Sequence, residues 1–199
     1  MGDGYKQVLR GGSDPLVFFK YPGADGGAGY SRGHVMAAAL AAALRDGETV
    51  VLGANGMIPL AAARLAQLTH APGLTIIAGA SGGVNTLVEP LVPSSGDYAN
   101  LVAETVLPFE DVLALQMSGH SDVFFAGGIQ IDRHGNCNLS VALDNGKVKL
   151  RGPGSAGLPW AARSGRVLLY SPTHTPSVFV SQVDFISLRG RHGSESPST

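Results

Sequence analysis

Cysteine and charged residues are scarce in this sequence. Its 199 residues include one cysteine, Cys137, so an internal disulfide is excluded and a reducing compartment is favoured. Charged residues make up 15% of the chain, whereas an average soluble domain has about 25%. So little charge indicates either an unusually large core or an apolar face that a partner protein covers, and we favour the covered face.

Basic clusters and long apolar runs are also missing. The net charge is −1 and no group of lysines and arginines stands out, which excludes a surface that binds nucleic acid by neutralising phosphates. The two most apolar segments, 35–44 and 50–60, are shorter than the roughly 20 residues of a membrane span. The first residues lack the pattern of a signal peptide, so the sequence predicts a cytoplasmic protein without a membrane span.

Glycine is abundant, and its distribution divides the chain. Residues 1–30 are glycine-rich and irregular, which predicts a leader or an arm laid across a partner. Residues 31–188 have the length of one domain with a substantial core. Residues 189–199 are polar and are predicted to form a disordered tail.

Apolar runs and glycine turns alternate within the predicted domain. Ser31 is a suitable N-cap for an alanine-rich helix, and Pro59 stands where a second helix can begin. Strand, glycine turn, helix and strand in this order are typical of an α/β fold, an open sheet of mostly parallel strands with flanking helices. The predicted helices are 32–45, 59–68 and 109–119; the predicted strands are 49–53, 74–77, 123–131, 166–170 and 178–185; residues 83–93 are predicted to be irregular.

Four loops are rich in glycine, asparagine and serine. Ligands of open α/β sheets bind in the loops that follow the carboxyl ends of the strands. Backbone N–H groups and short polar side chains in such loops can stabilise an oxyanion, although each loop alone can equally be a tight turn. The four loops are 53–56, 79–83, 132–138 and 151–157.

The last two loops carry the most specific pattern. Residues 128–138 read Gly-x-Gln-x-Asp-x-x-Gly-Asn-x-Asn, and 151–157 read Arg-x-x-Gly-Ser-x-Gly. Together with 68–77 ahead of Ser-Gly-Gly at 81–83, they resemble the beta subunit of class I coenzyme A transferases, over residues 31–187. The resemblance implies a CoA-transferase-like fold, a CoA thioester as substrate without a bound cofactor, and an alpha-type partner subunit in a heterodimer or heterotetramer.

The resemblance also indicates a missing nucleophile. In the family, the loop that corresponds to 79–83 carries a glutamate that forms a covalent glutamyl-CoA thioester, and Ala80 stands in its place here. This implies hydrolysis, cyclisation or C–C cleavage without such an intermediate. A steroid-catabolic relative, whose essential carboxylate lies on its alpha-type subunit, is a precedent. Two alternatives stay open: an ordinary transferase with its glutamate elsewhere, and a catalytically silent partner subunit.

The candidate site residues follow from the same loops. Asn55, Ser81 and His134 are the catalytic candidates, and His134 has the alternative role of an exposed turn residue. The expected ligand-binding residues are Gly56, Gly82, Gly83, Gln130, Asn136, Asn138, Arg151, Gly154, Ser155 and Gly157. Arg151 can clamp a carboxylate or phosphate, or simply lie at the surface. No pair among the six histidines has metal-ligand spacing on one element, so we expect no metal site.

Other polar side chains are assigned no chemistry. We interpret Cys137 as a small turn residue, since no sequence neighbour would activate its thiol. The carboxylates nearest to Ala80 in sequence, Glu89, Glu104 and Glu110, are interpreted as solvated surface groups.

Overall fold

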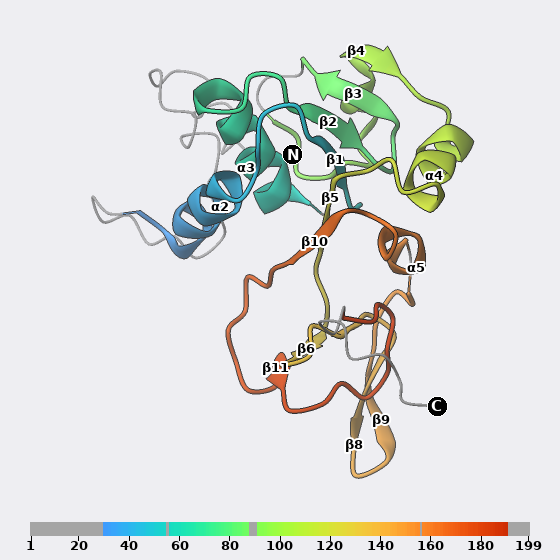
Figure 1. Ribbon diagram of the computed structural model, residues 1–199. Helices are drawn as coiled ribbons and strands as arrows, with labels where there is room; N and C mark the ends of the chain where they lie inside the picture. Colours follow the sequence, from blue (N-terminus) through green and yellow to red (C-terminus); the bar gives the residue numbers. More distant parts are fainter. Residues whose placement is uncertain (1–29, 55, 88–90, 156, 191–199) are drawn as a thin grey trace, which may run out of the picture. The chain divides into compact units, whose positions relative to one another are not determined.

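The computed structural model describes residues 30–54, 56–87, 91–155 and 157–190 (Figure 1). The chain divides into two compact units: unit 1 contains the chain up to Phe125 together with 164–166, and unit 2 contains 126–163 and the chain from Val167 onward. That residues 31–188 fold as one domain stays a prediction. The predicted leader and tail lie outside the described residues, apart from Tyr30, Arg189 and Gly190.

Unit 1 is built on three parallel strands. They are β1 (Thr49–Leu52), β2 (Thr75–Ala78) and β5 (Val123–Ala126), in the order β5-β1-β2. Each is a short apolar run that is almost entirely buried, as expected of strands covered on both faces. The predicted α/β fold with a mostly parallel sheet is therefore confirmed, although strand 123–131 was predicted too long.

Two antiparallel strands extend this sheet beyond β2. They are β3 (Gly83–Thr86), antiparallel to β2, and β4 (Ala103–Val106), antiparallel to β3. The prediction that residues 83–93 are irregular is wrong for 83–86, which form β3. Asparagine is uncommon in strands, so Asn85 interrupts the pattern by which a strand is predicted. Its φ is +48°, and its side-chain Oδ1 accepts a hydrogen bond from Ile76 N at 2.9 Å. The asparagine thus fills a ladder position that a regular strand residue would occupy.

The helices of unit 1 begin close to the predicted positions. They are α2 (Arg32–Ala42), α3 (Met57–Thr69), α4 (Phe109–Met117) and the 3-10 helix η2 (Tyr98–Leu101). Ser31 is confirmed as the N-cap of α2: its hydroxyl accepts from His34 N, and the His34 ring accepts from Ser31 N. Helices α2 and α3 lie side by side, with the sheet between them and α4 (Figure 1).

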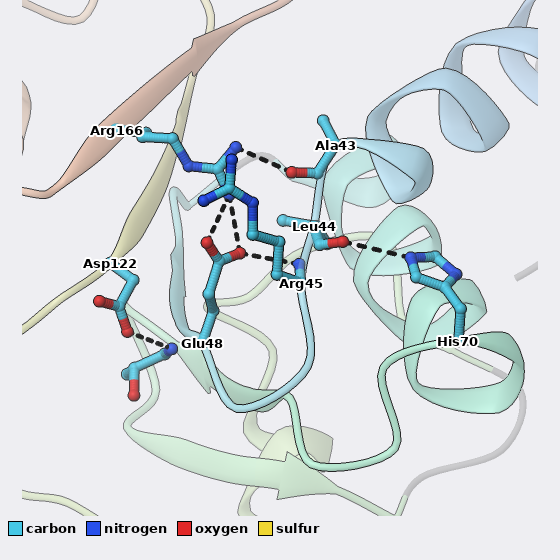
Figure 2. Close-up of polar contacts among 8 residues, drawn as sticks. Ala43, Leu44, Arg45, Glu48, His70, Asp122 and Arg166 are labelled. Carbon is cyan, nitrogen blue, oxygen red and sulfur yellow. Dashed lines mark hydrogen bonds and ion pairs between the residues drawn. The ribbon is translucent and has the colours of Figure 1, made fainter.

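An ion pair between Arg166 and Glu48 lies at the amino ends of the strands in unit 1 (Figure 2). The Arg166 guanidinium binds both carboxylate oxygens of Glu48, at 2.6 and 2.7 Å, and also donates to Ala43 O at 2.8 Å. Asp122 accepts from Thr49 N at 2.7 Å. These contacts hold the returning chain against β1 and β5, at the sheet edge opposite the candidate loops. We therefore assign these contacts a role in stabilising the fold.

Unit 2 consists of small elements joined by turns. They are β6 (Gln130–Asp132), β7 (Cys137–Asn138), β8 (Val141–Asp144), β9 (Lys147–Arg151), α5 (Leu158–Ala161), β10 (Arg166–Leu169) and β11 (Phe179–Val180). The first residue of β10, Arg166, belongs to unit 1. Strand β6 pairs with β7 and β11, while β8 and β9 form a separate hairpin. The predicted strand 166–170 is confirmed by β10.

Two strand predictions fail in unit 2. The single strand 123–131 is two strands, β5 and β6, and the chain between them contains Gly128, where a Cβ would lie 2.4 Å from Cys137 Sγ. The strand predicted over 178–185 is reduced to the two residues of β11. Within the described part of the chain, no helix is long and apolar enough to cross a membrane.

Candidate functional site

The loop after β2 depends on three glycines. A Cβ on Gly79 would lie 2.5 Å from Leu52 O, and a Cβ on Gly82 would lie 2.0 Å from Leu107 O. Gly82 also has a φ of +84°, which L side chains rarely adopt. A Cβ on Gly83 would lie 2.0 Å from the backbone oxygen of Asn100. Backbone packing within unit 1 therefore explains why Gly82 and Gly83, both predicted to bind ligand, are glycines.

Ala80 lies exposed in this loop, just beyond the carboxyl end of β2. Gly96 lies near it: a Cβ on Gly96 would lie 3.5 Å from the Ala80 methyl group. The next residue, Ser81, donates its backbone N–H to Ser95 O at 3.1 Å. The loop of Ala80 and the segment 94–97 are thus packed against each other.

Two serines bind segment 94–97 to the end of β1 as well. The Ser95 hydroxyl donates to Gly53 O at 2.8 Å, and the Ser94 hydroxyl donates to Ala54 O. Three segments consequently meet at the carboxyl edge of the sheet in unit 1: 53–54, 79–83 and 94–97. This is the edge at which α/β proteins bind their ligands.

The predicted residues of the first loop are placed only in part. Asn55 lies outside the described residues. Gly56 is buried and begins α3, where its carbonyl accepts from Leu60 N at 2.8 Å.

Ser81 differs from the other serines of this edge. Its Oγ is buried and has no hydrogen-bond partner among the described residues, and the same holds for Oδ1 of Asn100. A buried hydroxyl without a partner costs about 1–3 kcal/mol, so such groups usually serve a ligand, a water or a catalytic step. Of the catalytic candidates, Ser81 is the one with an unused hydroxyl at the carboxyl edge of the sheet.

The Asp132 turn of unit 2 is held by its own side chains. Asp132 is buried and accepts from the backbone N–H of His134 at 2.9 Å and from the Asn136 amide at 2.9 Å. Burial raises the pKa of the Asp132 carboxyl, but hydrogen bonds from Asn136, His134 and Val183 outweigh it and leave the pKa below its ordinary value. Asn136 also accepts from Gly190 N at 2.9 Å.

Gln130 and Asn138 form a second internal network. Gln130 Oε1 accepts from Asn138 Nδ2 at 2.8 Å, and its Nε2 donates to Asp184 Oδ2 at 2.7 Å. Asn138 donates in addition to Val141 O at 2.7 Å. Both side chains are buried and hydrogen-bonded to protein groups. Together with Asn136, they join the strands of unit 2, and their binding of a ligand stays a prediction.

His134, Arg151 and Cys137 differ in accessibility. His134 and Arg151 are exposed, and the His134 ring accepts from Arg133 Nε at 3.3 Å. Cys137 is fully buried, and burial raises the pKa of its thiol to about 12. A thiol with so high a pKa is a poor nucleophile near neutral pH. Cys137, interpreted from the sequence as a small turn residue, lies instead in strand β7.

The glycines of the loop 151–157 differ in how much space surrounds them. Gly154 has a φ of +89° with nothing within 4 Å of a Cβ, and Ser155 Oγ lies 3.4 Å from Ser140 Oγ. Gly157 begins α5. A Cβ on Gly152 would lie 2.0 Å from Leu139 O, which sequence reasoning did not anticipate.

Sequence reasoning also missed segment 94–97. Its Ser-Ser-Gly-Asp composition was a turn signal, but the contacts of Ser94 and Ser95 reach residues some forty positions away in sequence. In the described ranges, no group of three or more His, Cys, Asp or Glu side chains could hold a metal ion.

A partly parallel α/β sheet, with glycine and serine loops at the carboxyl edge of its strands, defines a class of ligand-binding α/β proteins. A model of the coenzyme A transferase family matches residues 34–165, which is more than half of the chain. The chain therefore belongs to the coenzyme A transferase family, and the resemblance seen in its sequence is confirmed.

Three known proteins are similar to this chain. A 3-oxoadipate CoA-transferase subunit of Pseudomonas knackmussii is 35% identical over 82% of this chain and 62% of its own length. The cholesterol ring-cleaving hydrolase IpdB subunit of Rhodococcus jostii is 34% identical over 65% of this chain and 48% of its own length. The solved structure of the decarboxylase AibA/AibB has a TM-score of 0.73 at 25% identity, covering 80% of this chain and 67% of the matched one. The chain thus spans 62% or less of both curated relatives.

Proposed function

We propose that this chain is the beta-type subunit of a heteromeric enzyme that acts on an acyl-CoA or another acyl thioester, without a glutamyl-CoA intermediate on this chain. The observation that carries the proposal is Ala80, a methyl group exposed at the carboxyl end of β2, where the family resemblance puts the nucleophilic glutamate. A methyl group cannot attack a thioester. Among the reactions without such an intermediate we favour hydrolysis, because a 34% identical relative is a hydrolase by name.

The surroundings of Ala80 support a retained thioester site. Gly79, Gly82 and Gly83 keep the loop tight, and the Ser81 hydroxyl is free of protein partners among the described residues. We assign Ser81 to stabilise the oxyanion that forms when a nucleophile adds to the substrate carbonyl. Asn55, His134 and Arg151 are proposed to contact the substrate from their own loops.

Exposed apolar side chains support the alpha-type partner. Tyr98 is 82% exposed, Val102 58% and Phe109 51%, all within unit 1. Apolar surface of this kind marks protein interfaces. We propose a heterodimer or heterotetramer with an alpha-type chain of the same family, located in the cytoplasm, as the single cysteine suggests.

The test uses the complex of this chain with a co-expressed alpha-type chain. After incubation with acetoacetyl-CoA or 3-oxoadipyl-CoA, intact-mass measurement should show no CoA adduct on this chain, while free thiol is released. The Ala80→Glu variant is the matched positive control, because a glutamate here would restore the family's nucleophile.

Two results would overturn the proposal. A CoA adduct on any glutamate of the unmodified chain would make it an ordinary CoA-transferase subunit, the function named for the 35% identical relative. Absence of both adduct and thiol release would make it a catalytically silent subunit.

A further inference from the structure

A hydrolase needs a base to activate water, and the loop of Ala80 supplies none. In unit 1, the loop of Ala80 is hydrogen-bonded to segment 94–97, and the carboxylate of that segment is Asp97. A Cβ placed on Gly96 would lie 3.5 Å from the Ala80 methyl group, Ser95 O accepts from Ser81 N at 3.1 Å, and Asp97 is the next residue of the same segment. Its side chain is exposed.

Asp97 is held in a fixed position by its backbone and one carboxylate oxygen. Its N–H donates to Ser94 O at 3.2 Å, and its carbonyl accepts from Asn100 N at 3.0 Å and from Asn100 Nδ2 at 3.1 Å. Its Oδ1 accepts from Ala99 N at 2.9 Å, which caps η2. No described residue binds Oδ2, so one oxygen of a well-positioned carboxylate is available for a water molecule.

The other described carboxylates of unit 1 are engaged or lie elsewhere. Asp46, Glu48 and Asp122 bind Gly73 N, Arg166 and Thr49 N at the opposite edge of the sheet. Glu104 accepts from Asn85 Nδ2 at 2.8 Å. The remaining two, Glu110 and Asp111, lie in the first turn of α4. Among the described carboxylates of unit 1, Asp97 is therefore the one that belongs to the segment hydrogen-bonded to the loop of Ala80.

We propose that Asp97 is the general base of the hydrolysis proposed above, an assignment that rests on that function. Oδ2 accepts a proton from a water molecule while the water oxygen bonds to the thioester carbonyl carbon, whose oxygen takes up the negative charge. The C–S bond then breaks, and the proton on Asp97 passes to the departing thiolate. The products are a carboxylic acid and CoA thiol, and the Asp97 carboxylate is restored.

The test compares Asp97→Asn with the unmodified chain in the complex with the alpha-type subunit. The amide Oδ1 of asparagine still accepts from Ala99 N, so the cap of η2 is kept while the base is lost. Thiol release from acetoacetyl-CoA should fall about 100-fold or more in kcat, with KM changed less than about 3-fold because binding is retained. Asp111→Asn on α4 is the matched control and should leave both constants unchanged.

A second variant separates catalysis from folding. Asp97→Ala should lose the same activity and recover part of it in added sodium formate, because formate can take the place of the deleted carboxylate; a structural role would not respond to formate. The proposal is overturned if the unmodified complex hydrolyses acetoacetyl-CoA and Asp97→Asn keeps its kcat, since the base then lies on the partner subunit. If the unmodified complex releases no thiol, the proposed function itself fails.

Discussion

The two units are stabilised by different interactions. The largest fully buried side chains of unit 1 are apolar except for Asn100, and they include Phe125 and Leu52. The interior of unit 2 is rich in polar groups: Gln130 is hydrogen-bonded to Asn138, and Asp132 accepts from Asn136 and from backbone N–H groups. Burial of apolar area is non-directional, whereas each of these hydrogen bonds fixes one loop in one conformation. A motif of conspicuous polar residues can thus encode a loop conformation as well as a ligand contact.

The largest effect is expected in the apolar core of unit 1. Phe125→Ala should lower the free energy of unfolding by about 3–5 kcal/mol, since the side chain is fully buried and leaves a cavity. Phe109→Ala is the control, because Phe109 is half exposed and its loss should cost less than about 0.5 kcal/mol. Urea unfolding followed by circular dichroism measures both. Equal costs would show that apolar burial does not dominate unit 1.

Glycine loops of the two units should respond differently to alanine. Gly83→Ala forces a methyl group to within 2.0 Å of Asn100 O, which we expect to cost about 3 kcal/mol because backbone must move. Gly154→Ala meets open space and only the strain of a φ of +89°, about 1 kcal/mol. Urea midpoints of the two variants test this order. A reversed order would mean that the loop of unit 2 is the more tightly packed one.

The smallest effect concerns acid stability in unit 2. The pKa of Asp132 is lowered in the folded chain, so its ionised form stabilises the fold above the unfolded pKa, near 3.8, and this contribution is lost as pH falls through the folded pKa. Asp132→Asn should therefore destabilise the chain at pH 6 and show a smaller loss of stability between pH 5 and pH 3 than the unmodified chain. Asp144→Asn, at the exposed end of β8, is the control. Parallel pH profiles of the Asp132 variant and the unmodified chain would contradict the assignment.

The sequence predicted those elements whose signals are local. The apolar runs of β1 and β2 and the Ser31 cap of α2 needed no distant partner to be found. The β8–β9 hairpin was missed although Asn145-Gly146, with φ values of +49° and +75°, is a strong turn signal. No element was predicted between the loops 132–138 and 151–157.

Part of the candidate site could not be read from sequence for a physical reason. An amide such as Gln130 or Asn138 has the same donors and acceptors whether it binds a ligand or a neighbouring strand. The composition of the loops identified them, but their partners depend on the fold. Ser94 and Ser95 show the converse: their hydrogen bonds to Ala54 O and Gly53 O exist only once segment 94–97 lies at the carboxyl edge of the sheet.

The path of the chain through unit 1 has a practical consequence for protein engineering. The chain leaves unit 1 after Phe125 and returns at Ser164, where the Ser164 hydroxyl lies 2.6 Å from that of Ser121 and the Arg166 guanidinium binds Glu48. The entropy cost of closing such an excursion rises only with the logarithm of its length. Extra residues placed between Asn145 and Gly146, where a Cβ on the glycine would meet nothing within 4 Å, should therefore be tolerated. That turn is a suitable position for an affinity tag or a fluorescent reporter.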